Sequence, residues 1–172
     1  MKKRIQLILV LLSVIVLSSC NKDDDSVLEN TMEIDGQLHY INGGFIDGAH
    51  VLNDDLTWDF ASIITLYGDG INYDPRLARF TGRGFVIRMK MHSSIHGLQL
   101  GNYSYSESGE PLTFNEAGYT TNFDVDSDQN ELDAIIVSGS MSVARQNEHT
   151  IHFNLTDSEG RKIIGHSEYY MF

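Results

Sequence analysis

The 172-residue chain contains very few cysteines and prolines, the residues that cross-link a fold and interrupt its regular elements. Cys20 is its only cysteine, so no intramolecular disulfide can form and the fold must be stabilised by its core alone. Two prolines, Pro75 and Pro111, are the only ones available to break extended segments. The nearly unbroken apolar stretch from Ile5 to Leu17 is shorter than the roughly 20 residues of a membrane-spanning helix.

Catalytic signatures are also lacking. There is no Gly-x-Ser-x-Gly elbow for a nucleophilic serine. The segments Gly68-Asp69-Gly70 and Gly82-Arg83-Gly84 are typical of turns, because a phosphate-binding loop needs a strand before it and a helix after it. We therefore expect a noncatalytic protein without a cofactor. A hydrolase would instead need a deep pocket that holds two close carboxylates, or a histidine beside a carboxylate.

Positive charge is scarce. Lys and Arg together number 12, against 24 Asp and Glu, and three of the basic residues lie in the first 19 positions. Residues 20–172 therefore carry nine basic and 24 acidic side chains, a net charge of −15. Such a surface repels the phosphate backbone of nucleic acids, so we expect no nucleic-acid partner.

The N-terminus has the layout of an export signal. Three basic residues, Lys2-Lys3-Arg4, precede the apolar stretch, which ends in Leu17-Ser18-Ser19-Cys20. This ending resembles the lipobox of bacterial lipoproteins. The resemblance implies that residues 1–19 are a signal peptide, that Cys20 is diacylated, and that the protein is held to a membrane by lipid, since several acyl chains bind firmly.

An acidic segment follows the cysteine. Asn21-Lys22-Asp23-Asp24-Asp25-Ser26 has no apolar residue to bury, so residues 20–30 are expected to form a solvated tether. The triplet Asp23, Asp24 and Asp25 resembles the export signal of Bacteroidota lipoproteins, which implies an outer-membrane protein that faces the cell exterior. The alternative is an acidic spacer in a lipoprotein that faces the periplasm.

Residues 31–172 have the pattern of a single β domain. In Phe85–Met91 every second side chain is apolar, which predicts a strand with one buried face. The dipeptide Asp35-Gly36 predicts a hairpin, and Asp157–Gly160 predicts another turn. Asp74–Phe80 is the one segment that could form a helical turn. Alternation further predicts that four residues near the C-terminus share one face: Ile135, Val137, Met141 and Val143.

About 8–10 strands in this length suit two all-β architectures. One is an antiparallel β-sandwich, and the other is a flattened, lipocalin-like β-barrel. We favour the sandwich, because a barrel around a ligand usually needs longer strands than the pattern shows.

Strand-and-turn segments such as Met32–Tyr40 and Ser138–Val143 together resemble the small β-rich Bacteroidota lipoproteins of unknown function. The resemblance spans most of the chain after Cys20, and it implies an all-β fold with no catalytic residues. The segments are Met32–Tyr40, Leu100–Tyr103, Ser138–Val143, Thr150–Phe153 and Ile164-Gly165.

Two groups of side chains are candidate sites. Asp124, Asp126 and Asp128 alternate as calcium ligands do, although the glycine and the final glutamate of an EF-hand loop are missing; a solvated loop is the alternative. Aromatic rings on a sheet face bind sugars by stacking and hydrogen bonding, whereas inward-facing rings would only fill the core. The aromatic candidates are Trp58, Tyr103, Tyr105, Tyr169 and Tyr170.

The sequence thus predicts a membrane-anchored, noncatalytic lipoprotein that binds an extracellular ligand, with glycan as one candidate. A structural or interaction subunit of an envelope assembly, partnered by another envelope protein, is the alternative. Glu148, His149 and His152 are also candidates to approach His166, which lies on the next predicted strand.

Overall fold

The computed structural model describes residues 29–52, 58–128, 131–145 and 147–169, and every regular element in these ranges is a strand. None of the described residues belongs to a helix with the length and hydropathy needed to cross a membrane. The strands are β1 (Thr31–Ile34), β2 (Gln37–Leu52), β3 (Trp58–Gly68), β4 (Asn72–Asp74), β5 (Arg79–Thr81), β6 (Arg83–Ser93), β7 (Gly101–Tyr105), β8 (Thr113–Asp124), β9 (Ala134–Arg145), β10 (His149–Asp157) and β11 (Lys162–Tyr169).

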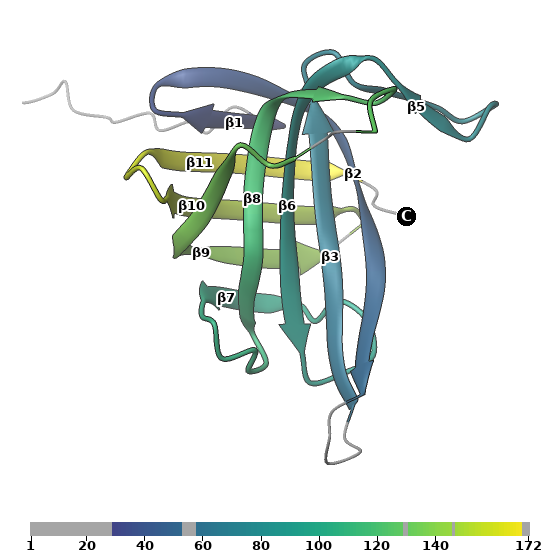
Figure 1. Ribbon diagram of the computed structural model, residues 1–172. Helices are drawn as coiled ribbons and strands as arrows, with labels where there is room; N and C mark the ends of the chain where they lie inside the picture. Colours follow the sequence, from purple (N-terminus) through teal and green to yellow (C-terminus); the bar gives the residue numbers. More distant parts are fainter. Residues whose placement is uncertain (1–28, 53–57, 129–130, 146, 170–172) are drawn as a thin grey trace, which may run out of the picture.

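Nine of these strands form a closed barrel, in the order β1-β11-β10-β9-β7-β8-β6-β3-β2. The predicted all-β class is confirmed, and the barrel is the architecture that forms rather than the favoured sandwich. Closure depends on β1, which pairs antiparallel with β2 on one side and with β11 on the other. In Figure 1, β3, β6 and β8 run up the view while β7, β9, β10 and β11 run across it, so the barrel is flattened into two crossing layers.

The strands are longer than the sequence pattern indicated. β2 extends over 16 residues and contains Gly43, Gly44 and Gly48, which interrupt the apolar alternation without ending the strand. A Cβ on Gly43 would lie 2.5 Å from the Tyr67 hydroxyl, so a larger residue there would displace that ring. The argument from strand length against a barrel was therefore wrong. Asp74–Phe80 is likewise no helical turn, since it lies in the β4–β5 hairpin.

Side chains fill the barrel interior. Alternate residues of each strand point inward, as in β6, where Phe85, Ile87, Met89 and Met91 are all fully buried. The predicted alternation of β6 is confirmed.

The prediction for β9 was wrong in part. Met141 and Val143 are buried as expected, but Ile135 and Val137 are exposed and Ile136 is buried instead. The ladder with β10 shifts register between Thr156 and Asp157, which reverses the faces of the first residues of β9.

A second, smaller apolar cluster lies on the outer side of the barrel wall. Tyr67, Ile71 and Val86 form its buried centre. Tyr67 and Val86 adjoin the inward residues Leu66 and Ile87 along their strands, so they point away from the barrel interior. This outer cluster is where a pocket forms.

Candidate ligand-binding site

A pocket of about 410 Å³ lies on the outer wall of β2, β3 and β6. Such a volume falls within the range of small-molecule sites, which are mostly apolar with a few polar groups. The residues that line it are Phe45, Asp47, Thr65, Tyr67, Ile71, Phe80, Val86, Arg88, Phe123 and Val125.

The strand register accounts for the floor of the pocket. Phe45 of β2 pairs with Thr65 of β3, which pairs in turn with Arg88 of β6. One step along the sheet, Tyr67 pairs with Val86. These residues share the outward face because inward and outward positions alternate along each strand. The pocket therefore has an apolar floor, and the polar side chains Asp47 and Arg88 lie at its rim.

The β4–β5 hairpin forms the upper wall of the pocket. The Phe80 ring lies 5.5 Å from the Phe45 ring and 5.0 Å from the rings of both Tyr67 and Tyr73, measured between centroids. Figure 1 shows this hairpin projecting from the end of the β3–β6 pair. Phe80 therefore packs the hairpin against the aromatic side chains of the barrel wall.

Glycines let the two ends of the hairpin meet closely. A Cβ on Gly84 would lie 2.2 Å from the Gly68 carbonyl oxygen, and one on Gly82 would lie 2.1 Å from that of Gly70. Gly82 also has a φ of +97°, which side chains rarely adopt. The predicted turn glycines thus set the position of the hairpin that covers the pocket.

The acidic segment after β8 contacts the same hairpin. Arg83 donates a hydrogen bond to the Asp124 carboxylate, and the Asp126 carboxylate lies 3.7 Å from the Arg79 guanidinium. The bond from Arg83 holds the pKa of Asp124 below its usual value. Asp128 is exposed. Calcium binding by Asp124, Asp126 and Asp128 stays a prediction, while the arginine contacts give two of them a structural role beside Val125.

Two charged side chains of opposite sign line the pocket. Arg88 and Asp47 are both exposed, and neither has a hydrogen-bond or ion-pair partner among the described residues. The neighbouring Lys90 differs, because its ammonium lies 2.6 Å from the Glu116 carboxylate. Arg88 and Asp47 are thus available to a ligand.

The aromatic residues predicted to bind a ligand do not form one surface. Tyr103 was expected on a stacking surface, but it is 1% exposed and faces the core. Its hydroxyl donates a hydrogen bond to the Gln99 carbonyl, 2.5 Å away. Tyr105 is half-buried against Phe114. Tyr169 is half-buried and donates to the Ile41 carbonyl.

The remaining predicted site residues fall outside the described part of the chain. They are Cys20, Asp23, Asp24, Asp25 and Tyr170, together with the side chain of Trp58.

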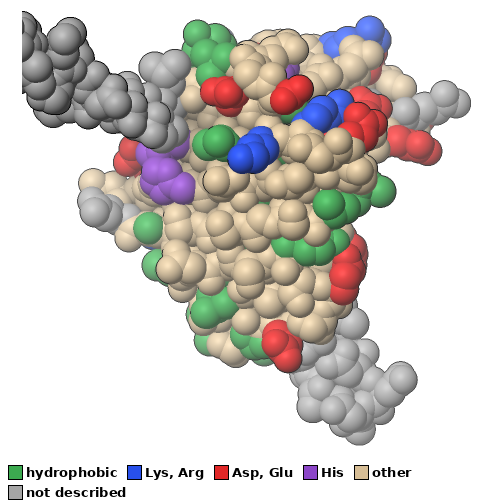
Figure 2. Space-filling model, turned by 90° about the vertical axis from the view of Figure 1, so that its left-hand side faces the viewer, with side chains coloured by type: hydrophobic (Ala, Val, Ile, Leu, Met, Phe, Trp, Pro, Cys, Tyr) green, Lys and Arg blue, Asp and Glu red, His purple; other side chains and the backbone are tan. Residues whose placement is uncertain are grey.

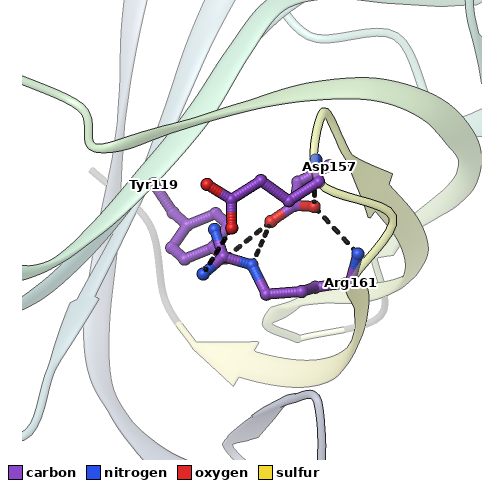
Figure 3. A network of polar contacts seen from close by, with 4 residues as sticks. Tyr119, Asp157 and Arg161 are labelled. Carbon is purple, nitrogen blue, oxygen red and sulfur yellow. Dashed lines mark hydrogen bonds and ion pairs between the residues drawn. The ribbon is translucent and has the colours of Figure 1, made fainter.

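A polar network joins the β10–β11 turn to β8 (Figure 3). The Asp157 carboxylate is 1% exposed and accepts hydrogen bonds from the Tyr119 hydroxyl at 2.9 Å and from Arg161 Nε at 2.7 Å. The backbone N–H groups of Glu159 and Arg161 donate to its second oxygen. Burial alone would raise the pKa of Asp157, but these hydrogen bonds lower it. Burial and the bond to Asp157 raise the pKa of Tyr119 to about 12.

A histidine does lie beside a carboxylate, as a hydrolase would require. His39 Nδ1 is 2.6 Å from Asp69 Oδ2, and His39 lines a polar pocket of about 440 Å³ together with Tyr119 and Arg161. Within the described residues, however, no serine or threonine hydroxyl is hydrogen-bonded to His39. The pair has an orienting carboxylate without an activated nucleophile.

Of the side chains expected to approach His166, His152 does so. The two residues are directly paired between β10 and β11, with ring centroids 4.1 Å apart. Figure 2 shows histidine side chains together on this face, where hydrophobic side chains are spaced apart rather than gathered into one patch. In the described part of the chain, no third His, Cys, Asp or Glu joins the pair to form a metal site.

Sequence reasoning missed the pocket, although it contained one signal. Val86 is an apolar residue on the face of β6 that alternation assigns to water, and in the structure it is 5% exposed. Its burial against Tyr67 and Ile71 marks an outer cluster that the inward pattern does not explain.

Comparison with known proteins adds no assignment. No protein-family model, no curated protein and no solved structure matches this chain.

Proposed function

We propose that this protein is a lipid-anchored, noncatalytic binding protein of the bacterial outer membrane that takes up a small extracellular ligand at the pocket beneath the β4–β5 hairpin. One observation carries the proposal. The outer wall has an apolar, partly aromatic pocket of about 410 Å³, although the barrel interior is already filled by its own core.

The lining of the pocket supports a ligand with an apolar or aromatic body. Phe45, Tyr67, Phe80 and Phe123 present ring surface, and stacking between rings adds to the burial of apolar area. A glycan, the first candidate from the sequence, is more polar than this lining favours.

The N-terminal sequence supports the anchoring. Acylation of Cys20 would hold the domain at the membrane, and the acidic tether through Asp23–Asp25 would present the pocket to the cell exterior. The alternative, a structural subunit of an envelope assembly, requires a protein partner rather than a small ligand. Crosslinking on whole cells separates the two, because a subunit would be recovered with a stoichiometric partner.

Calorimetry on the lipidated protein in nanodiscs tests the binding function. The water-soluble probe 3-phenylpropionamide carries a ring and no charge, and empty nanodiscs provide the blank. We expect saturable binding that is abolished by Thr65→Phe, which places a ring in the pocket. Thr150→Phe, on the outward face of β10, is the matched control and should bind normally. Failure of the unmodified protein to bind any ring-bearing probe would refute the proposal.

A further inference from the structure

We propose that the pocket selects a zwitterion, in which an ammonium group and an anionic group are attached to an apolar or aromatic body, as in an aromatic amino acid. This inference rests on the proposed function and names the ligand class of the same site. Its basis is a pair of opposite charges, Arg88 and Asp47, at the edge of one ring-lined pocket, neither of which has a partner within the described ranges.

The strand register keeps these two charges apart. Arg88 is in β6 and Asp47 is in β2, with β3 between them. Phe45 of β2 lies directly across β3 from Arg88, because both residues pair with Thr65. Asp47 lies two residues further along β2 than Phe45. Two strand spacings of roughly 5 Å and two residues of roughly 3.3 Å place their backbones about 12 Å apart. Neither side chain neutralises the other, and a ligand between them can contact both.

A ligand with only one charge fits this arrangement less well. An anion would contact Arg88 and gain nothing from Asp47. A cation near Asp47 would gain from the ring faces but would make no favourable contact with Arg88. Lys90 does not supply a second free cation beside the pocket, since it is already paired with Glu116. A zwitterion satisfies both charged groups and still buries its body against Phe45 and Tyr67.

A matched series of four probes tests the inference by calorimetry on the lipidated protein in nanodiscs. L-Phenylalanine is the zwitterion, 3-phenylpropionate the anion, 2-phenylethylamine the cation and 3-phenylpropionamide the neutral compound. All four carry the same ring on a short chain. We expect L-phenylalanine to bind at least tenfold more tightly than any of the other three.

Two conservative variants assign each charge. Arg88→Gln should weaken L-phenylalanine and 3-phenylpropionate about tenfold and leave 2-phenylethylamine unchanged. Asp47→Asn should weaken L-phenylalanine and 2-phenylethylamine to a similar extent and leave 3-phenylpropionate unchanged. Because both side chains are exposed, both variants should fold, and unchanged thermal unfolding verifies this.

The outcomes separate this inference from the proposed function. Equal binding of L-phenylalanine and the neutral amide would overturn the zwitterion and leave the apolar pocket in place. Equal binding of L-phenylalanine and either singly charged probe would also overturn it, because one of the two charges would then be idle. Absence of binding by all four probes would refute the proposed function itself.

Discussion

The ring of Phe80 in β5 meets the ring of Tyr67 in β3 edge to face, with 5.0 Å between centroids and 78° between planes. This contact joins a two-stranded hairpin to the wall of a nine-stranded barrel. Phe80 also contacts Tyr73 within the hairpin, so its ring lies at the centre of the aromatic contacts that join the hairpin to the barrel.

We therefore expect Phe80→Ala to release the hairpin while the barrel remains folded. The loss of ring contacts and buried area should cost about 2 kcal/mol of local stability. Hydrogen exchange should become faster in β4 and β5 and stay unchanged in β10. Leu77→Ala, at a hairpin residue that is 65% exposed, is the control and should change neither region. Protection of β4 and β5 that survives Phe80→Ala would show that other contacts hold the hairpin.

The glycine contact at the base of the hairpin makes a second prediction. Gly84→Ala places a Cβ 2.2 Å from the backbone oxygen of Gly68, so the two chain segments must separate. Forced overpacking of this kind costs about 1–3 kcal/mol, which urea denaturation can measure. Gly48→Ala is the matched control, because a Cβ at that position would meet no atom within 4 Å beyond its chain neighbours. Equal stability of the two variants would contradict the close approach.

The Asp157 network predicts a loss of stability in acid. The pKa of Asp157 is lower in the folded protein than in the unfolded chain, whose value is about 3.9, so its contribution is complete above that pH and is lost as the pH falls through the folded value. Asp157→Asn should lower the free energy of unfolding by about 1–3 kcal/mol at pH 7. The difference from the unmodified protein should shrink toward pH 2. A difference in unfolding free energy that did not change with pH would show that the Asp157 charge does not contribute to stability.

Tyr119, in the same network, predicts the opposite dependence in alkali. Its pKa is raised to about 12, whereas an unfolded tyrosine titrates near 10. Its contribution to stability is therefore complete below pH 10 and is lost as the pH rises toward 12. Tyr119→Phe should remove the part of the alkaline destabilisation that follows tyrosinate absorbance at 295 nm. An identical alkaline unfolding curve for the variant would refute this assignment.

The pair of His152 and His166 predicts a third pH effect. Burial first, and the charge of His152 second, lower the pKa of His166. A histidine with a lowered pKa stabilises the fold above pH 6.5, and this contribution is lost as the pH falls. His166→Gln should therefore flatten the decline in unfolding free energy between pH 7 and pH 5. His96→Gln, in the exposed segment after β6, serves as the control and should leave the slope as it is.

The sequence predicted what short-range alternation encodes. The inward face of β6, from Phe85 to Met91, followed from a period of two, and the closeness of β10 to β11 followed from the short turn between them. Long-range pairing is different, because which strand meets β1 depends on the whole barrel. Sandwich and barrel share the same local pattern, and only the pairing of β1 with β11 distinguishes them.

The site depends on pairings between strands that lie far apart in the sequence. Arg88 and Asp47 face one pocket only because β3 pairs with both of their strands. The register shift opposite Asp157 likewise cannot be seen in β9 alone, and it moved Ile136 to the inside. Tyr103 was expected on a stacking surface but faces the core, in agreement with its alternation with the exposed Asn102 and Ser104.

The four-residue strand β1 has a mechanical consequence. It is the seam that closes the barrel, and it begins three residues after position 28, downstream of the proposed lipid attachment. A pull transmitted from the membrane along the chain would load this seam lengthwise. The ladders from β1 to β2 and to β11 would then resist together in shear, so the first described strand after the proposed lipid attachment is also the strand that closes the barrel.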